Sequence, residues 1–179
     1  MRTHRTSRGL TMVETVVSVA IVSLISAGVV GVMGASGRLA RRARANQFAS
    51  QENRRSLERV INALRSASLD SLSGFDANGL STAPQYNPVI ACESDTPVLG
   101  PPQVIQWYAT PDRGGALNPG QVDLVTGGFR TCLADRVQSG GFRVVLTGNT
   151  MKVFLTTYAP EADGGVVYAT GEGSVTIRN

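Results

Sequence analysis

Apolar and polar positions follow three different patterns along the chain. Residues 10–33 read LTMVETVVSVAIVSLISAGVVGVM, an apolar run with one ionisable side chain, Glu14. Residues 34–73 show apolar positions at helical spacing among many arginines. After residue 74 the chain turns to short apolar runs separated by Gly, Pro, Ser and Asn. These patterns predict a long N-terminal helix followed by a β-sheet head over residues 74–179.

The first run is long enough to cross a membrane. At about 1.5 Å per residue, 24 helical residues span roughly 36 Å, whereas the hydrocarbon core of a bilayer is about 30 Å thick. A cleaved secretory signal has a shorter apolar stretch of about 7–15 residues, followed by a small-x-small cleavage site. We therefore predict a transmembrane helix over residues 10–33.

The second segment has the spacing of an amphipathic helix. Residues 38–72 contain no proline, and Leu57, Val60, Ile61 and Leu64 fall at i, i+3, i+4 and i+7, with Ala67 and Ser68 continuing the stripe. Eight arginines between residues 38 and 65 lie largely off this stripe. We expect the apolar stripe to cover a sheet. The arginines are interpreted as a surface that faces solvent or lipid headgroups, with contact to the phosphates of lipid or DNA as the alternative.

The head is predicted to be an antiparallel sheet. Gly148-Asn149, between two alternating apolar runs, is typical of a two-residue hairpin turn, and Gly171 to Gly173 suggests a second tight hairpin. The expected strands are Val89–Cys92, Val104–Ala109, Gln121–Thr126, Phe129–Ala134, Phe142–Thr147, Thr150–Tyr158, Val166–Thr170 and Ser174–Arg178. The predicted fold class is thus α+β: a long N-terminal helix, membrane-spanning in its first half and amphipathic in its second, packed on this sheet.

Composition excludes several kinds of site. The 179 residues are 42% hydrophobic and 17% charged, which excludes wholesale disorder. A single histidine, His4, and two cysteines cannot build a multi-histidine or four-cysteine metal site, and there is no glycine-rich phosphate loop before a helix. We expect no metal, no cofactor and no enzymatic activity.

The head contains two pairs of acidic residues and one aromatic pair, and we interpret them as structural rather than functional residues. Asp123 with Asp135, and Glu161 with Asp163, are expected to be turn and surface acids, and Trp107-Tyr108 is expected to be a half-buried strand pair.

Positive charge is concentrated at the front of the chain. The formal net charge is +4 and the pI is about 9.6. Residues 1–9 hold three arginines and no acid, whereas the region after residue 65 holds more acids than bases. The head is therefore not expected to bind nucleic acid, although a basic protein often does.

The residues around Glu14 form a specific motif. The basic leader MRTHRTSRG ends in Gly9, apolar Leu10 follows, and Glu14 is the fifth residue after the glycine, at the start of the apolar run. This arrangement closely resembles the type III signal of prepilins, the precursors of type IV pilins and of the pseudopilins of type II secretion and competence systems. The resemblance covers about the first 60 residues of the chain.

The resemblance implies a processing step and an assembly contact. Prepilin peptidase would cut the Gly9–Leu10 bond and methylate the new amine of Leu10. Glu14 would then pair with the Leu10 amine of a neighbouring subunit, which offsets the desolvation of both groups. Removal of the leader, residues 1–9, would leave 14 basic and 13 acidic residues.

The resemblance also implies partners and a location. The partners would be prepilin peptidase, other pilin subunits in a helical filament, an inner-membrane assembly platform and membrane lipid. The protein would lie in the bacterial inner membrane as a single-pass protein with its head outside the cytoplasm, and then in a pilus or periplasmic pseudopilus.

The span departs from common pilins in two ways. Leu10 stands where Phe is commonest, and no proline occurs before Pro84. Instead glycines recur at every third residue, at positions 28, 31, 34 and 37. Such spacing fits either close helix packing or a segment that melts on assembly, and both interpretations remain open.

The two cysteines fall in the head. In a compartment outside the cytoplasm, Cys92 and Cys132 are expected to form a disulfide, which would close a loop of about 40 residues and stabilise the fold by roughly 4 kcal/mol. The alternative is two buried free thiols.

The sequence therefore predicts a structural subunit of a type IV pilus or pilus-like filament. One alternative is a type II secretion or competence pseudopilin. An alternative from another class is a signal-anchored surface protein that binds a ligand and does not polymerise.

Overall fold

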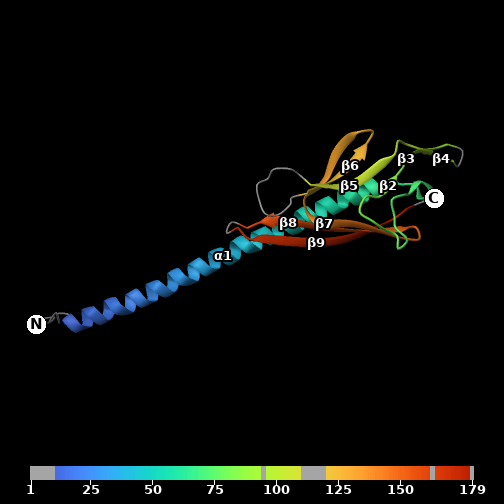
Figure 1. The fold of residues 1–179 in the computed structure, drawn as a ribbon. Helices are drawn as coiled ribbons and strands as arrows, with labels where there is room; N and C mark the ends of the chain where they lie inside the picture. Colours follow the sequence, from blue (N-terminus) through green and yellow to red (C-terminus); the bar gives the residue numbers. More distant parts are fainter. Residues whose placement is uncertain (1–10, 94–95, 110–119, 162–163, 178–179) are drawn as a thin grey trace, which may run out of the picture. The chain divides into compact units, whose positions relative to one another are not determined.

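The computed structural model describes residues 11–93, 96–109, 120–161 and 164–177 (Figure 1). It confirms the predicted α+β fold, in which one long N-terminal helix packs against a C-terminal antiparallel sheet. The chain forms two compact units, one ending at Arg42 and the other beginning at Ala43.

The helix α1 covers Met12–Leu64, 53 residues, and continues through the four glycines at positions 28, 31, 34 and 37. It ends earlier than the predicted boundary near Leu72. The residues after it bind another part of the chain: the Val89 amide donates to the Ser66 carbonyl at 2.6 Å, and the Ser68 amide donates to the Asn87 carbonyl at 3.2 Å. Because these backbone groups bond to Asn87 and Val89, they do not form the next turn of the helix, and α1 ends. A short 3-10 helix, η1, follows at Leu69–Ser71.

The described strands form two antiparallel sheets. The larger sheet has the order β2-β5-β6-β7-β8-β9, with β1 paired to β7 off this path, and the smaller sheet pairs β3 with β4. The strand bounds are β1 Leu80–Ser81, β2 Gln85–Tyr86, β3 Val89–Glu93, β4 Thr96–Leu99, β5 Gln103–Ala109, β6 Gly120–Thr126, β7 Phe129–Thr147, β8 Thr150–Pro160 and β9 Val166–Thr176.

Strand β7 joins two predicted strands into one that is interrupted by a bulge. Its first part pairs with β6 and its second part with β8 and β1, and the register shifts between Val137 and Phe142. Gly140, at φ 72°, adopts a left-handed conformation there, and a Cβ on Gly141 would lie 2.9 Å from the carbonyl oxygens of Gln138 and Thr156. The bulge allows one strand to belong to both parts of the sheet.

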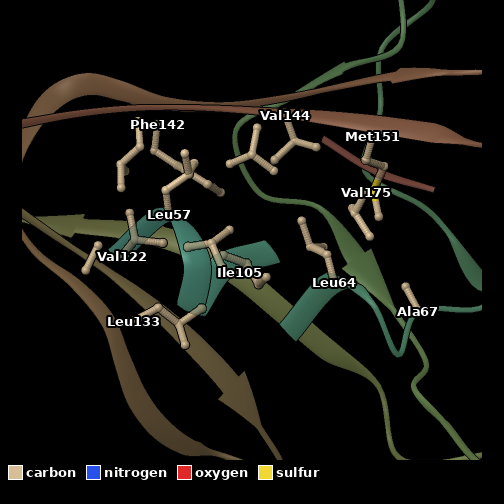
Figure 2. Packing of buried hydrophobic residues seen from close by; sticks show 14 of the residues in the cluster. Leu57, Leu64, Ala67, Ile105, Val122, Leu133, Phe142, Val144, Met151 and Val175 are labelled. Atoms are coloured by element: carbon tan, nitrogen blue, oxygen red, sulfur yellow. The ribbon is translucent and has the colours of Figure 1, made fainter. Parts of the chain in front are cut away.

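Side chains from both parts of the sheet converge on the helix. Figure 2 shows Phe142 and Val144 of β7, Ile105 of β5 and Val122 of β6 gathered around Leu57 and Leu64 of the helix in one cluster. The predicted stripe is confirmed, since Leu57, Val60, Leu64, Ala67 and Ser68 are all buried and Ile61 is partly buried. The predicted inward faces are confirmed too, with Phe142, Val144, Met151, Val153 and Leu155 all buried and Leu146 partly buried.

The predicted turn at Gly148-Asn149 is confirmed, but the second predicted hairpin is wrong. Strand β9 runs without interruption through Gly171 and Gly173, which pair with Leu155 and Val153 of β8. A Cβ on Gly171 would collide with the side chain of Asn53, and a Cβ on Gly173 with that of Ile61. These glycines therefore let α1 lie close beneath β9, and they do not mark a turn.

A buried amide fixes this close contact. The side chain of Asn53, 4% exposed, donates from Nδ2 to the carbonyl oxygens of Leu155 and Ala169, both at 2.9 Å. One residue of α1 thereby binds the backbones of β8 and β9. At the end of the helix, the buried Tyr86 hydroxyl donates to the Ala63 carbonyl at 3.1 Å, and burial raises the pKa of Tyr86 so that the hydroxyl keeps its proton.

The Asn53→Ala substitution should destabilise the head markedly. It removes two hydrogen bonds and leaves two carbonyls without this donor, at a cost of about 2–3 kcal/mol. The free energy of unfolding should be measured by urea denaturation of the full chain in detergent, followed by the fluorescence of Trp107, the single tryptophan. Asn62→Ala, at an exposed asparagine of the same helix, should change it by less than about 0.5 kcal/mol. Equal losses in the two variants would contradict the role assigned to Asn53.

Candidate functional site

The first turn of α1 is capped by Thr11. The Glu14 amide donates to Thr11 Oγ1 at 3.3 Å, and the Thr15 amide donates to the Thr11 carbonyl at 3.1 Å. The residues Thr11-Met12-Val13-Glu14 have the S/T-x-x-E spacing of a capping box. The helix therefore begins at a defined residue, with Glu14 in its first turn, where the positive end of the helix dipole favours a carboxylate. This spacing is visible in the sequence and was missed by the sequence reasoning above.

Glu14 is exposed and has no ion-pair partner among the described residues. The nearest cation of the same helix, Arg38, lies 24 residues further on, about 36 Å along the helix axis. No cation of the described part of α1 is therefore within reach of this carboxylate.

The residues after Glu14 form an exposed apolar surface. Val13 is 73% exposed, Leu24 77% and Val30 70%, and residues 11–44 include no buried residue. Among the described residues, α1 is the one helix that is both long and apolar enough to cross a membrane. It is compatible with a single-pass membrane anchor, as the sequence predicts for residues 10–33.

The polar side chains in this segment bond to their own helix. The hydroxyl of Ser23 donates to the Val19 carbonyl at 2.7 Å, and that of Ser26 to the Val22 carbonyl at 2.8 Å. Thr15 and Ser36 do the same with carbonyls of the preceding turn. These four hydroxyls need no water, and Glu14 is the one ionisable side chain among residues 11–37.

The glycines at positions 28, 31, 34 and 37 lie in continuous helix and have open space around them. A Cβ added at any of the four would meet no atom within 4 Å. Glycine costs about 1 kcal/mol relative to alanine inside a helix, so this stretch is the weakest part of α1 by intrinsic propensity.

Two expected site residues cannot be placed. The predicted cleavage site and methylation site, Gly9 and Leu10, lie outside the described residues.

The disulfide expected between Cys92 and Cys132 is not formed, because Cys132 carries a free and exposed thiol. Cys132 lies in β7 of the larger sheet, opposite Asp123, whereas Cys92 lies in β3, whose partner in the described chain is β4 of the smaller sheet. The two positions thus share no strand pairing that would hold them together. The side chain of Cys92 lies outside the described part of the structure.

Acidic neighbours surround the Cys132 thiol. Partial burial raises the pKa of Cys132, and the negative charges of Asp123 and Asp135 raise it further. The positive charge of Arg59 and a backbone hydrogen bond at Ala134 act in the opposite direction. A raised pKa leaves the thiol protonated and a poor nucleophile at neutral pH.

Asp123 differs from the surface acid that the sequence predicts. It is only 1% exposed, and one of its oxygens accepts a hydrogen bond from Gln121 Nε2 at 2.8 Å while the other, Oδ1, has no partner among the described residues. The register shifts of β6 at Val122 and Asp123 explain its burial, because they place two successive side chains out of solvent.

The rest of the head shows structural contacts. Trp107 and Tyr108 are half-buried, as predicted; Trp107 Nε1 donates to the Val137 carbonyl at 3.3 Å, and Arg130 stacks on the Tyr108 ring at 4.1 Å. Over the residues that can be described, no group of three or more His, Cys, Asp or Glu side chains is placed to hold a metal ion.

Comparison with protein-family models, with curated proteins and with solved structures found no match for this chain.

Removing the charge of Asp123 should make Cys132 more acidic. In a Cys92→Ser background, the Asp123→Asn substitution removes the negative charge that opposes the thiolate, so the pKa of Cys132 should fall. The measurement is the rate of alkylation by iodoacetamide as a function of pH. Asp70→Asn, at an exposed acid of η1, is the matched control and should leave the midpoint unchanged. A midpoint that stays fixed or rises in the Asp123 variant would contradict this environment.

Proposed function

We propose that this protein is a structural subunit of a type IV pilus or pilus-like filament, assembled through its N-terminal helix. The observation that carries the proposal is Glu14, an exposed carboxylate in the first turn of an apolar helix with no ion-pair partner among the described residues. It stands five residues after Gly9, behind the basic leader that resembles a prepilin signal.

A lone carboxylate in such a segment needs a partner. On insertion scales, an acidic residue in the centre of a membrane span costs about 2.5–3.5 kcal/mol, and it normally marks a binding partner or a function. Here the hydroxyls of Thr15, Ser23 and Ser26 bond within the helix, so Glu14 remains as the ionisable group to be satisfied. A cation from a second helix would do so.

The proposed cation is the amine of a neighbouring subunit. Prepilin peptidase would cleave the Gly9–Leu10 bond and methylate the amine of Leu10, and the methylated amine keeps its positive charge. Glu14 of one subunit would pair with the Leu10 amine of the next. A misplaced subunit would leave two charges unpaired in apolar surroundings, so the pair would set the stagger between helices.

The membrane supplies the place of assembly. Before polymerisation the subunit would be held in the bacterial inner membrane by residues 10–33, with the head outside the cytoplasm, and it would meet an inner-membrane assembly platform. The second half of α1 packs against the sheet of the head and shares its buried core, which supports a structural role. The described part of the head has no metal-binding cluster.

A type II secretion or competence pseudopilin is the second candidate, because the prepilin-like signal and Glu14 support it equally.

Replacing Glu14 by Gln tests polymerisation separately from membrane insertion. We expect the Glu14→Gln variant to enter the membrane normally, whereas its incorporation into filaments should fall by a factor of 100 or more. Breaking one partner of a buried ion pair costs about 3–5 kcal/mol, which accounts for that factor. The two readouts are the membrane fraction and the sheared filament fraction of cells.

Glu52→Gln is the matched control, since it removes a carboxylate from the same helix at a position outside the apolar segment, and it should assemble like the wild type. Normal incorporation of the Glu14 variant into filaments would contradict the pairing role of Glu14, whereas a wild-type protein that is absent from the filament fraction would support a membrane-anchored protein that does not polymerise.

A further inference from the structure

The first charged residues after the apolar segment form a compact group of arginines. No Asp, Glu, Lys or Arg occurs between Glu14 and Arg38, and then Arg38, Arg41 and Arg42 follow within five residues. We call these three residues the arginine collar. All three lie in helix α1 and all three are exposed.

The collar occupies one face of the helix. Positions i, i+3 and i+4 lie within about 100° of one another around the axis, so three guanidinium groups point in a similar direction. Arg44, six residues after Arg38, falls outside this sector.

The charges of Arg38 and Arg41 are not balanced by acids of their own helix. Arg38 and Arg41 make no ion pair with any residue that the structure describes. The next acid of α1, Glu52, lies ten residues after Arg42, about 15 Å along the axis. Several like charges on one face, without acids between them, attract an anionic surface.

The position of the collar along the helix indicates which anionic surface it meets. Residues Met12 to Met33 cover roughly 33 Å, about the thickness of the hydrocarbon core, and Arg38 follows about 7.5 Å later. With a bilayer about 40–45 Å thick, the polar layer on each side measures about 5–7.5 Å, so Arg38 lies at its outer edge. Arg41 and Arg42 lie about 12 and 13.5 Å beyond Met33, from where their long side chains can extend back to the headgroups. The guanidinium fork also matches the two oxygens of a phosphate.

We propose that the arginine collar, Arg38, Arg41 and Arg42, binds the phosphate groups of anionic phospholipids at the membrane surface next to the head. This inference rests on the membrane anchorage in the proposed function, but not on polymerisation. It gives the subunit a lipid partner in the leaflet on the side of the head, which fixes how deep the helix sits before assembly.

Lipid selectivity of the full chain tests the proposal. The protein is reconstituted in vesicles of phosphatidylcholine that contain a minority of spin-labelled phosphatidylglycerol or spin-labelled phosphatidylcholine, and electron paramagnetic resonance gives the relative affinity of the two labelled lipids for the protein. Each cationic side chain near an anionic surface contributes about a fivefold gain in association. We expect the wild type to prefer phosphatidylglycerol by roughly tenfold or more, and the preference should weaken as salt is raised.

Three variants separate the collar from general basic charge. R38Q/R41Q/R42Q should lose most of the preference for phosphatidylglycerol. R38K/R41K/R42K keeps the charge and should retain most of it. R55Q/R59Q/R65Q removes the same number of arginines from exposed positions in the head, two in α1 and one directly after its end, and it should retain the preference in full. Circular dichroism of each variant checks that helix and sheet content is unchanged.

Distinct outcomes overturn distinct claims. An unchanged preference in R38Q/R41Q/R42Q, or an equal loss in R55Q/R59Q/R65Q, overturns the collar as a lipid site. Release of the labelled phosphatidylglycerol by a short duplex DNA, with tight binding of that DNA to the collar, would also overturn it in favour of nucleic acid. A wild-type chain that fails to insert into vesicles overturns the membrane anchorage itself, and therefore the proposed function.

Discussion

The account depends on the cost of one carboxylate in apolar surroundings. Glu14 is the one ionisable group in residues 10–33, and its chain offers it a helix N-terminus capped by Thr11 but no ion-pair partner among the described residues. A helix dipole contributes at most about 2 kcal/mol to such a charge, which is less than the roughly 3–5 kcal/mol that an unpaired charge costs when it is buried among packed helices. A cation from another subunit would supply the stabilisation that the helix dipole does not. The proposed assembly therefore rests on the unpaired charge of Glu14.

The head is held against its helix by a close approach of the two backbones and by the hydrogen bonds of one buried side chain. Gly171 and Gly173 remove side chains where α1 passes beneath β9, and Asn53 fills the gap and binds the backbones of β8 and β9. These contacts hold the second half of α1 against the sheet within the unit that begins at Ala43. The arginine collar would serve the earlier, membrane-bound stage. Both features fit the proposed role as a structural subunit.

Periodicity predicted most of the fold and little of the head's detail. The stripe at Leu57, Val60 and Leu64 was predictable because a 3.6-residue period has one interpretation in a proline-free segment. The glycines of β9 were misinterpreted as a hairpin because glycine marks both turns and close approaches, and only the neighbouring helix decides between them. The burial of Asp123 depends on a bulge in β6, and the free thiol of Cys132 on sheet membership, neither of which a local pattern encodes.

The central claim is that a processed amine meets Glu14, and the N-terminus of the protein in its native membrane or filament tests it most directly. Mass spectrometry of the intact chain and of its N-terminal peptide should find a chain that begins at methylated Leu10 and lacks residues 1–9. A chain that still begins at Met1, or that begins at Leu10 without methylation in assembled filaments, would contradict the account.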